Sequence, residues 1–168
     1  HELRALGIGV DPVLVRDENG IRPETRQVLE AIARHGLVLA TGHLGRDDAF
    51  AVVDAAFDAG VETVVVTHPE FPSQSFSIEE QVALVERGCI VERCLSTPLS
   101  GKTAWEHVFE GIRAVGLDNN FFSSDFGNPD YPAVEDGLAM WADALLGAGF
   151  GDDEIRGMIV GGSRRVAG

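Results

Sequence analysis

Apolar runs alternate with amphipathic segments along this 168-residue chain, and this alternation constrains the fold more than any other feature. The predicted strands span 37–43, 63–68, 89–94 and 120–125, and each contains at least two consecutive apolar residues. A continuous apolar run suits a strand that is buried on both faces. Regular alternation of such strands with helices is typical of βαβ units. The sequence therefore predicts an α/β fold with a parallel sheet.

Helices are expected between and after these strands, at 46–59, 78–87, 104–115 and 137–148. Ser77 and Glu80 have the spacing of a capping box, and Thr103 and Glu106 repeat it. Asp152 is expected to cap a last short helix near 153–160.

The N-terminal part gives weaker signals. Gly9 to Val15 could hold a short strand, and the segment 17–20 is then a turn. Pro23 suits the first position of a helix that ends before Gly36.

The strand–helix units predict a barrel more strongly than a doubly wound nucleotide-binding sheet, because no Gly-rich phosphate loop follows any strand. A complete (β/α)8 TIM barrel typically takes about 250 residues. The 168 residues are therefore predicted to form a single domain (1–168) that covers roughly the C-terminal half of a TIM barrel, with four to five βα units. The other half is either lost from this chain or supplied by partner chains.

Composition excludes several functional classes. The net charge is −14, from 27 acidic and 13 basic residues. Such a charge repels phosphate backbones, so we expect no nucleic-acid partner and no binding to anionic membranes. No apolar run approaches the roughly 20 residues of a membrane span.

The two cysteines, Cys89 and Cys94, are expected to be buried free thiols, which favours a cytoplasmic location. Homo-oligomerisation stays open.

The C-terminal ends of the predicted strands carry His43, His68, Glu92 and Asp125. In parallel α/β barrels the active site lies at these ends. Imidazoles and carboxylates suit Zn²⁺, with Mn or Fe as alternatives. A bound metal lowers the pKa of a water molecule, and a nearby carboxylate can accept its proton. We therefore predict that these four residues bind a divalent metal, that Asp125 is also catalytic, and that the substrate is a small molecule.

Structural roles are the competing interpretation of each residue. A single histidine at a strand end is commonly a satisfied structural residue. Asp125 could instead cap the following segment or order the 126–136 loop. Glu92 could contact substrate, or pair with Arg93 or Arg113.

Other polar residues are weaker candidates. His35 and His107 lie at or inside predicted helices, so structural or surface roles are expected for both. Lys102 could reach substrate from the loop after the 89–94 strand, although a solvated lysine explains it equally simply. No Gly-x-Ser-x-Gly motif is present, so a serine hydrolase has no support.

At the strand ends the chain resembles the amidohydrolase superfamily of metal-dependent TIM-barrel hydrolases, and is similar to a poorly characterised amidohydrolase-like branch. The resemblance covers about residues 22 to 168. The tail Ile155 to Gly168 resembles the closing helix of that family, with Gly161-Gly-Ser in place of Asn-Pro-Ala. The matching motifs are Leu39-Ala-Thr-Gly-His43, Val66-Thr-His-Pro69 and Ser123-Ser-Asp125.

The resemblance implies that His43 and His68 match the histidines of strands five and six. Asp125 matches the strand-eight aspartate, which binds metal and accepts a proton. The His-x-His pair of strand one and the strand-four lysine or glutamate have no counterpart here. The implied activity is attack of a metal-activated water on an amide, ester, lactone or related bond. Two alternatives remain: a non-catalytic barrel-derived binding or scaffold protein, and a phosphoesterase of the polymerase-and-histidinol-phosphatase type.

Overall fold

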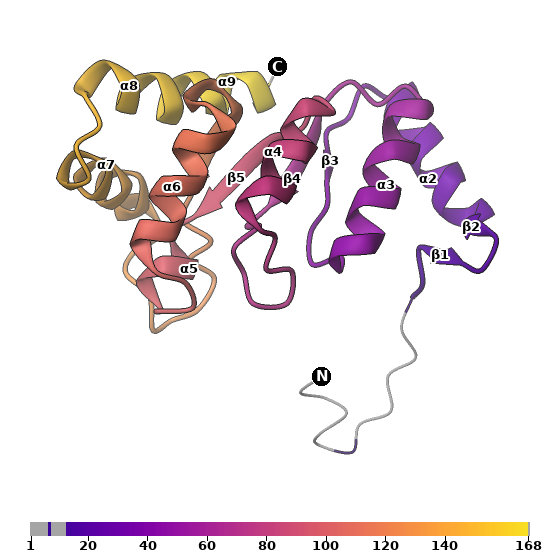
Figure 1. The fold of residues 1–168 in the computed structure, drawn as a ribbon, viewed down its shortest axis with the longest axis horizontal. Coiled ribbons are helices and arrows are strands. Elements are labelled where there is room, and N and C mark those ends of the chain that lie inside the picture. Colours follow the sequence, from indigo (N-terminus) through magenta and orange to yellow (C-terminus); the bar gives the residue numbers. More distant parts are fainter. Residues whose placement is uncertain (1–6, 8–12, 168) are drawn as a thin grey trace.

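The structure is a computed structural model that describes residue 7 and residues 13–167. Four strands form one parallel sheet in the order β3-β4-β5-β6, and Figure 1 labels the first three of them. Their bounds are Leu39–Ala40 for β3, Val64–Thr67 for β4, Ile90–Cys94 for β5 and Asn120–Ser123 for β6. The predicted α/β fold with a parallel sheet is confirmed. The strand predicted within Gly9 to Val15 falls largely outside the described residues.

Helices follow the strands much as the sequence predicts. A small antiparallel hairpin, β1 (Arg16–Asp17) with β2 (Gly20–Ile21), precedes them. The α-helices are α2 (Pro23–Arg34), α3 (Arg46–Asp58), α4 (Ile78–Glu86), α5 (Ser96–Leu99), α6 (Trp105–Val115), α7 (Gly137–Gly147), α8 (Asp152–Arg156) and α9 (Gly162–Ala167). Short 3-10 helices η1 (Leu117–Asn119) and η2 (Val134–Asp136), and a π-helix η3 (Gly157–Gly161), complete the described elements.

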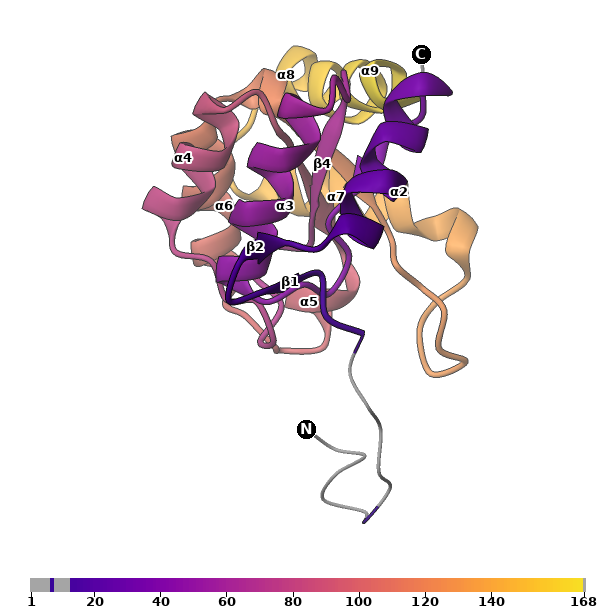
Figure 2. The same cartoon turned by 90° about the vertical axis from the view of Figure 1, so that its right-hand side faces the viewer.

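The connecting helices α3, α4 and α6 lie together on one side of the sheet (Figure 1, Figure 2). Because βαβ crossovers are almost always right-handed, strands added in sequence order place their helices on the same face. This arrangement is compatible with a barrel-type layout. The four described strands nevertheless form an open sheet and do not close into a barrel.

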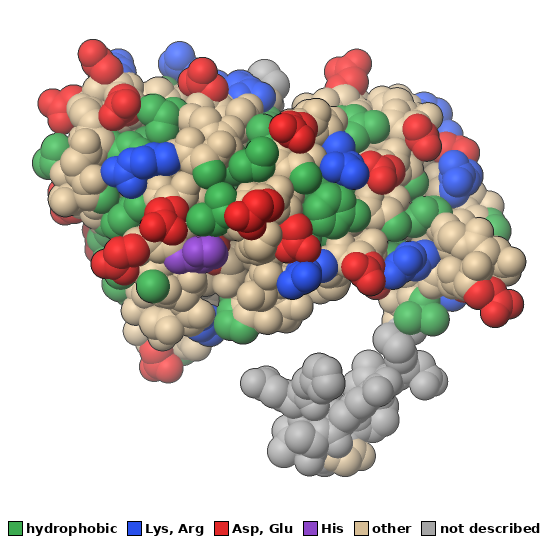
Figure 3. All heavy atoms as spheres, viewed as in Figure 1, with side chains coloured by type: hydrophobic (Ala, Val, Ile, Leu, Met, Phe, Trp, Pro, Cys, Tyr) green, Lys and Arg blue, Asp and Glu red, His purple; other side chains and the backbone are tan. Residues whose placement is uncertain are grey.

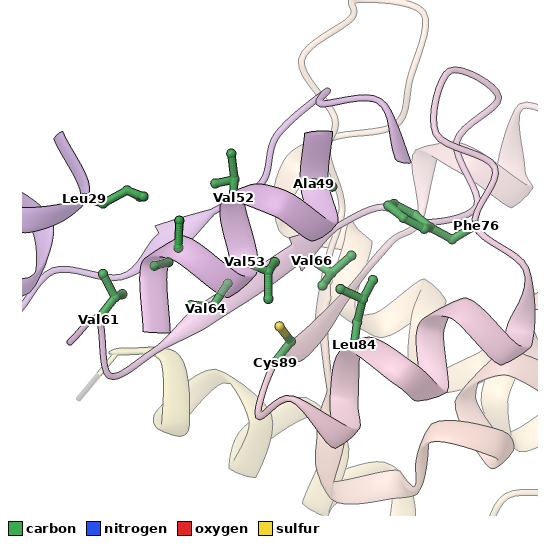
Figure 4. Packing of buried hydrophobic residues seen from close by; sticks show 12 residues of the cluster. Leu29, Ala49, Val52, Val53, Val61, Val64, Val66, Phe76, Leu84 and Cys89 are labelled. Atoms are coloured by element: carbon green, nitrogen blue, oxygen red, sulfur yellow. The ribbon is translucent and has the colours of Figure 1, made fainter. Parts of the chain in front are cut away.

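Two apolar clusters fill the space between sheet and helices. In the first, Val53 of α3, Val66 of β4 and Leu84 of α4 point toward one another (Figure 4). The second gathers Phe122 of β6 and Trp141 of α7 with residues of α6 and η3. All five side chains are buried, and burial of each aliphatic or aromatic side chain contributes about 1.5–3 kcal/mol.

A buried polar group lies between α4, α6 and the sheet. The Arg93 side chain is fully buried and forms an ion pair with Glu70. Its Nε donates to Asn120 Oδ1 (2.8 Å) and its Nη1 donates to Gln81 Oε1 (2.7 Å). A Cβ on Gly111 would lie 3.2 Å from Arg93 Nη1, so the glycine allows α6 to approach closely. Burial lowers the pKa of Arg93 from its usual value, and Glu70 opposes this effect.

This arrangement argues against the suggested pairing of Glu92 with Arg93. Consecutive residues in a strand point to opposite faces of the sheet, so the Arg93 side chain lies on the helix-covered face and Glu92 on the other. Arg113 also has other partners, since it lies over the Phe150 ring and donates to the carbonyl of Ala148.

The first residues of the observed helices can be compared with the predicted N-caps. The capping box at Ser77 and Glu80 is confirmed, and α2 begins at Pro23 as predicted. The second predicted box, Thr103 with Glu106, is wrong because α6 starts one residue later, with Ala104 at its N-cap. Asp152 is the first residue of α8 and not its cap.

Charged side chains are interspersed on the face that carries α3, α4 and α6. Acidic and basic side chains are both spread over that face, with the acidic ones predominating (Figure 3). Among the described residues, no helix has the length and apolar character needed to cross a membrane.

Candidate functional site

Three strand ends turn through the left-handed region of backbone conformation. The turning residues are Gly42 after β3 (φ +57°), His68 after β4 (φ +28°) and Asp125 after β6 (φ +52°). Glycine adopts this conformation freely, whereas other residues do so at a cost. Residues held in strained conformations concentrate at functional sites. The strain at His68 and Asp125 therefore indicates that these strand ends are candidate functional positions.

Two threonines join the ends of β3 and β4. Thr41 Oγ1 accepts a hydrogen bond from the backbone N–H of Thr67 (3.1 Å). In return, Thr67 Oγ1 accepts one from the backbone N–H of Gly42 (3.3 Å). The threonine that precedes each Gly-His or His motif therefore holds the two strand ends together.

This junction brings His43 and His68 into contact. Their ring centroids lie 4.6 Å apart, with an angle of 61° between the ring planes. His43 is exposed, whereas His68 is buried, with 3% of its surface accessible. Phe71 contacts both rings, with centroid distances of 5.6 Å to His43 and 5.0 Å to His68. The sequence placed these histidines on adjacent strand ends, and the structure brings them together.

Gln74 determines how the His68 ring presents its nitrogens. The Gln74 amide nitrogen donates to the carbonyl oxygens of Gly42 (2.6 Å) and Thr67 (3.3 Å). Its Oε1 therefore faces His68 Nδ1 at 2.7 Å and can only accept a hydrogen bond. In the neutral ring, Nδ1 then carries the proton and Nε2 keeps its lone pair. A metal-binding histidine commonly has such a partner on its other nitrogen.

Asp125 has a different partner. Ser96, which follows β5, donates its hydroxyl to Asp125 Oδ2 (2.8 Å). The backbone N–H of Ser96 donates to the carbonyl of Ser124 (3.0 Å), so β5 and β6 remain paired up to this point. The carboxylate of Asp125 is exposed and accessible to solvent. Sequence reasoning missed Ser96, although its position at a strand end was visible.

Glu92 lies on the sheet face opposite the helices, half-buried and in register with Thr67. Cys94 lies on the same face of β5. Burial raises the pKa of the Cys94 thiol, and the negative charges of Glu92 and Asp125 raise it further. These carboxylates are thus electrostatic neighbours of Cys94, and the thiol is a poor nucleophile at neutral pH.

The four predicted ligands do not assemble into one complete metal site. Across residue 7 and residues 13–167, no three or more His, Cys, Asp and Glu side chains are grouped so that they could hold a metal ion. His43 and His68 supply two neighbouring donors. Asp125 and Glu92 do not complete a three-donor set with them in the described part of the chain, so their role as ligands stays a prediction.

Lys102, from another loop, contacts Phe71, which is a neighbour of the histidine pair. Its Nζ lies 4.5 Å from the centroid of the Phe71 ring, which itself contacts both imidazoles. Lys102 was already a weaker candidate from the sequence, through its place in the loop after the 89–94 strand, and it is also the sole lysine of the chain. The remaining histidines of the described chain lie elsewhere: His35 at the end of α2 and His107 within α6.

Comparison with known proteins gives one match. A family described as a family of unknown function (DUF6282) matches residues 10–92, a span that includes His43, His68 and Glu92 and ends before Asp125. No curated protein and no solved structure matches the chain. The chain is thus similar, over its N-terminal half, to a family whose function is unknown.

Proposed function

We propose that these strand ends form part of the active site of a metal-dependent hydrolase of the amidohydrolase type. The observation that carries the proposal is the contact between His43 and His68, with the His68 ring held by Gln74. Two imidazoles at adjacent ends of parallel strands, one with a partner that leaves Nε2 free, are what a metal-binding pair requires. Strand order also supports a barrel-type sheet, because the strands are added in sequence order.

The residues fit a divalent metal in part. His43 and His68 would hold the ion, and Zn²⁺ suits imidazole donors best, with Mn or Fe as alternatives. Further donors would come from Asp125, from Glu92 or from outside the described residues, which by themselves form no three-donor group. When bound, the ion would lower the pKa of a water molecule and supply a nucleophile near neutral pH.

The protein's own groups then have separate tasks. Gln74 holds the His68 ring in one orientation and one tautomer. Asp125, which accepts a hydrogen bond from the Ser96 hydroxyl and is exposed, would serve as the proton acceptor. The substrate is a small molecule with an amide, ester, lactone or related bond.

A second candidate is a binding or scaffold protein without catalysis. The observation that favours it is the lack of a three-donor group among the described residues. In that case the contact between the imidazoles would be structural, and the chain would bind no metal at this position.

Zinc titration of the full chain separates the two candidates. We expect Zn²⁺ to shift the ring ¹⁵N resonances of His43 and His68. Alanine at either position should weaken zinc binding by about 10-fold or more, because each substitution removes a donor. The variants His35→Ala and His107→Ala serve as matched controls and should bind zinc as the parent chain does. Absence of zinc binding, or binding that survives loss of both His43 and His68, would overturn the hydrolase proposal in favour of the scaffold.

A further inference from the structure

Lys102 lies over Phe71, the aromatic ring that contacts both histidines of the candidate site. It is the sole lysine, and all other basic side chains are arginines. Some arginines pair with a carboxylate, as Arg46 does with Glu80 and Arg87 with Asp54. Others, such as Arg113, form no ion pair among the described residues. In the described part of the chain, Lys102 forms no such ion pair, although the protein carries a net charge of −14.

Two contacts position Lys102: a backbone hydrogen bond and a cation–π contact. Its backbone N–H donates to the carbonyl of Thr97 (3.1 Å), which ties the loop to α5 at the end of β5. Its ammonium lies over the Phe71 ring at 4.5 Å, an attractive arrangement for a cation. Phe71 is itself tied to the end of β4, because its N–H donates to the carbonyl of His68 (2.9 Å).

One aromatic ring thus connects the ammonium with both imidazoles. Phe71 has His43 and His68 within 5.6 Å and 5.0 Å, centroid to centroid, and Lys102 over its ring. A small molecule that extends from the histidine pair across Phe71 would reach an ammonium that has three donors and no carboxylate partner among the described residues.

We propose that Lys102 binds a carboxylate group on the molecule that occupies the site. Identification of that molecule as a substrate rests on the proposed hydrolase function. A monoanionic carboxylate fits better than a phosphate dianion, because the site offers one permanent cation and the same strand ends carry Asp125 and Glu92, which repel added negative charge. The substrate class is therefore a carboxylic acid that also carries the bond to be hydrolysed.

The sole lysine makes the test specific. Reductive methylation with ¹³C-formaldehyde labels Lys102 and the α-amino group, and keeps the positive charge. The labelled full chain is titrated, without added metal, with N-acetylglycine, which has a carboxylate and an amide. N-acetylglycinamide lacks the charge, sodium phosphate supplies the alternative anion, and sodium chloride at equal ionic strength controls for screening.

We expect N-acetylglycine to shift the Lys102 methyl signal saturably, and the amide and chloride to leave it unchanged. Calorimetry should show that Lys102→Met weakens N-acetylglycine binding about 10-fold or more, as for a lost charge-assisted hydrogen bond. Lys102→Arg should keep part of the affinity. Arg113→Gln removes a cation over the Phe150 ring (4.2 Å) on a different part of the surface and should have no effect.

Three results would overturn the inference: no saturable shift, an equal shift with N-acetylglycinamide, or tighter binding of phosphate. The outcome is independent of the zinc titration. Carboxylate binding without zinc binding would support Lys102 as a carboxylate site and remove the hydrolase, whereas zinc binding without carboxylate binding would do the reverse.

Discussion

Gln74 controls the tautomer of His68 through a single hydrogen bond. We predict that the neutral His68 ring carries its proton on Nδ1, because Gln74 Oε1 can only accept. In Gln74→Leu this preference should disappear, since the acceptor is removed. Long-range ¹H–¹⁵N correlation spectra distinguish the protonated ring nitrogen from the unprotonated one. His35, which lies at the end of α2, provides the internal control. A proton on Nε2 of His68 in the parent chain would contradict the prediction.

Sequence reasoning anticipated some site residues and missed others. The contact between His43 and His68 follows from parallel strands, because neighbouring strands end at the same edge of a sheet. Gln74 was missed, and Lys102 was named as a weaker candidate without its contact to Phe71, since both residues lie in loops. The path of a loop depends on contacts with the rest of the fold and leaves no periodic pattern in the sequence.

At the scale of elements, the buried ion pair joins the loop after β4 to the C-terminal part of β5. We predict that Glu70→Leu lowers the free energy of unfolding by about 3–5 kcal/mol, because it leaves the buried Arg93 guanidinium without its counter-charge. The double variant Arg93→Met with Glu70→Leu should be more stable than the single one. Urea denaturation of both variants measures the difference. If the double variant is the less stable of the two, burial of the lone guanidinium is not the cause.

Helices and strands were predicted more accurately than their ends. The helix predicted at 46–59 is observed as α3 (Arg46–Asp58). The strand predicted at 37–43 shrinks to β3 (Leu39–Ala40). Leu37 and Val38 are 55% and 39% exposed. In the described sheet β3 has one hydrogen-bonded neighbour, so its apolar residues form fewer ladder contacts than a central strand would.

At the scale of the whole molecule, the C-terminal helical segment packs against β6. A Cβ added at Gly162 would lie 2.3 Å from the carbonyl oxygen of Asn120, whereas one added at Gly161 would meet nothing within 4 Å. We predict that Gly162→Ala lowers the free energy of unfolding by about 1–3 kcal/mol through overpacking. Gly161→Ala should be close to neutral. Thermal or urea unfolding of the two variants provides the comparison, and equal stabilities would show that the segment does not pack in this way.

The direction of the strands was predictable, whereas closure of the sheet was not. Alternating strands and helices imply a parallel sheet. Each helix returns the chain to the end of the sheet where the previous strand began, so the next strand runs in the same direction. Whether such a sheet closes depends on strand tilt and stagger, and these have no signature in hydrophobic periodicity. The buried Arg93 was also hidden, because its partner Glu70 lies 23 residues earlier in the chain.

His68 and Asp125, which follow β4 and β6, adopt a left-handed backbone conformation that costs stability but places a candidate functional side chain at the strand end. Glycine at position 68 or 125 would relieve a backbone cost of about 1–3 kcal/mol, yet it would delete an imidazole or a carboxylate. Selection of this chain for thermal robustness alone would therefore tend to discard the groups at its strand ends. Engineering for heat resistance should leave these two positions untouched and seek its gains elsewhere.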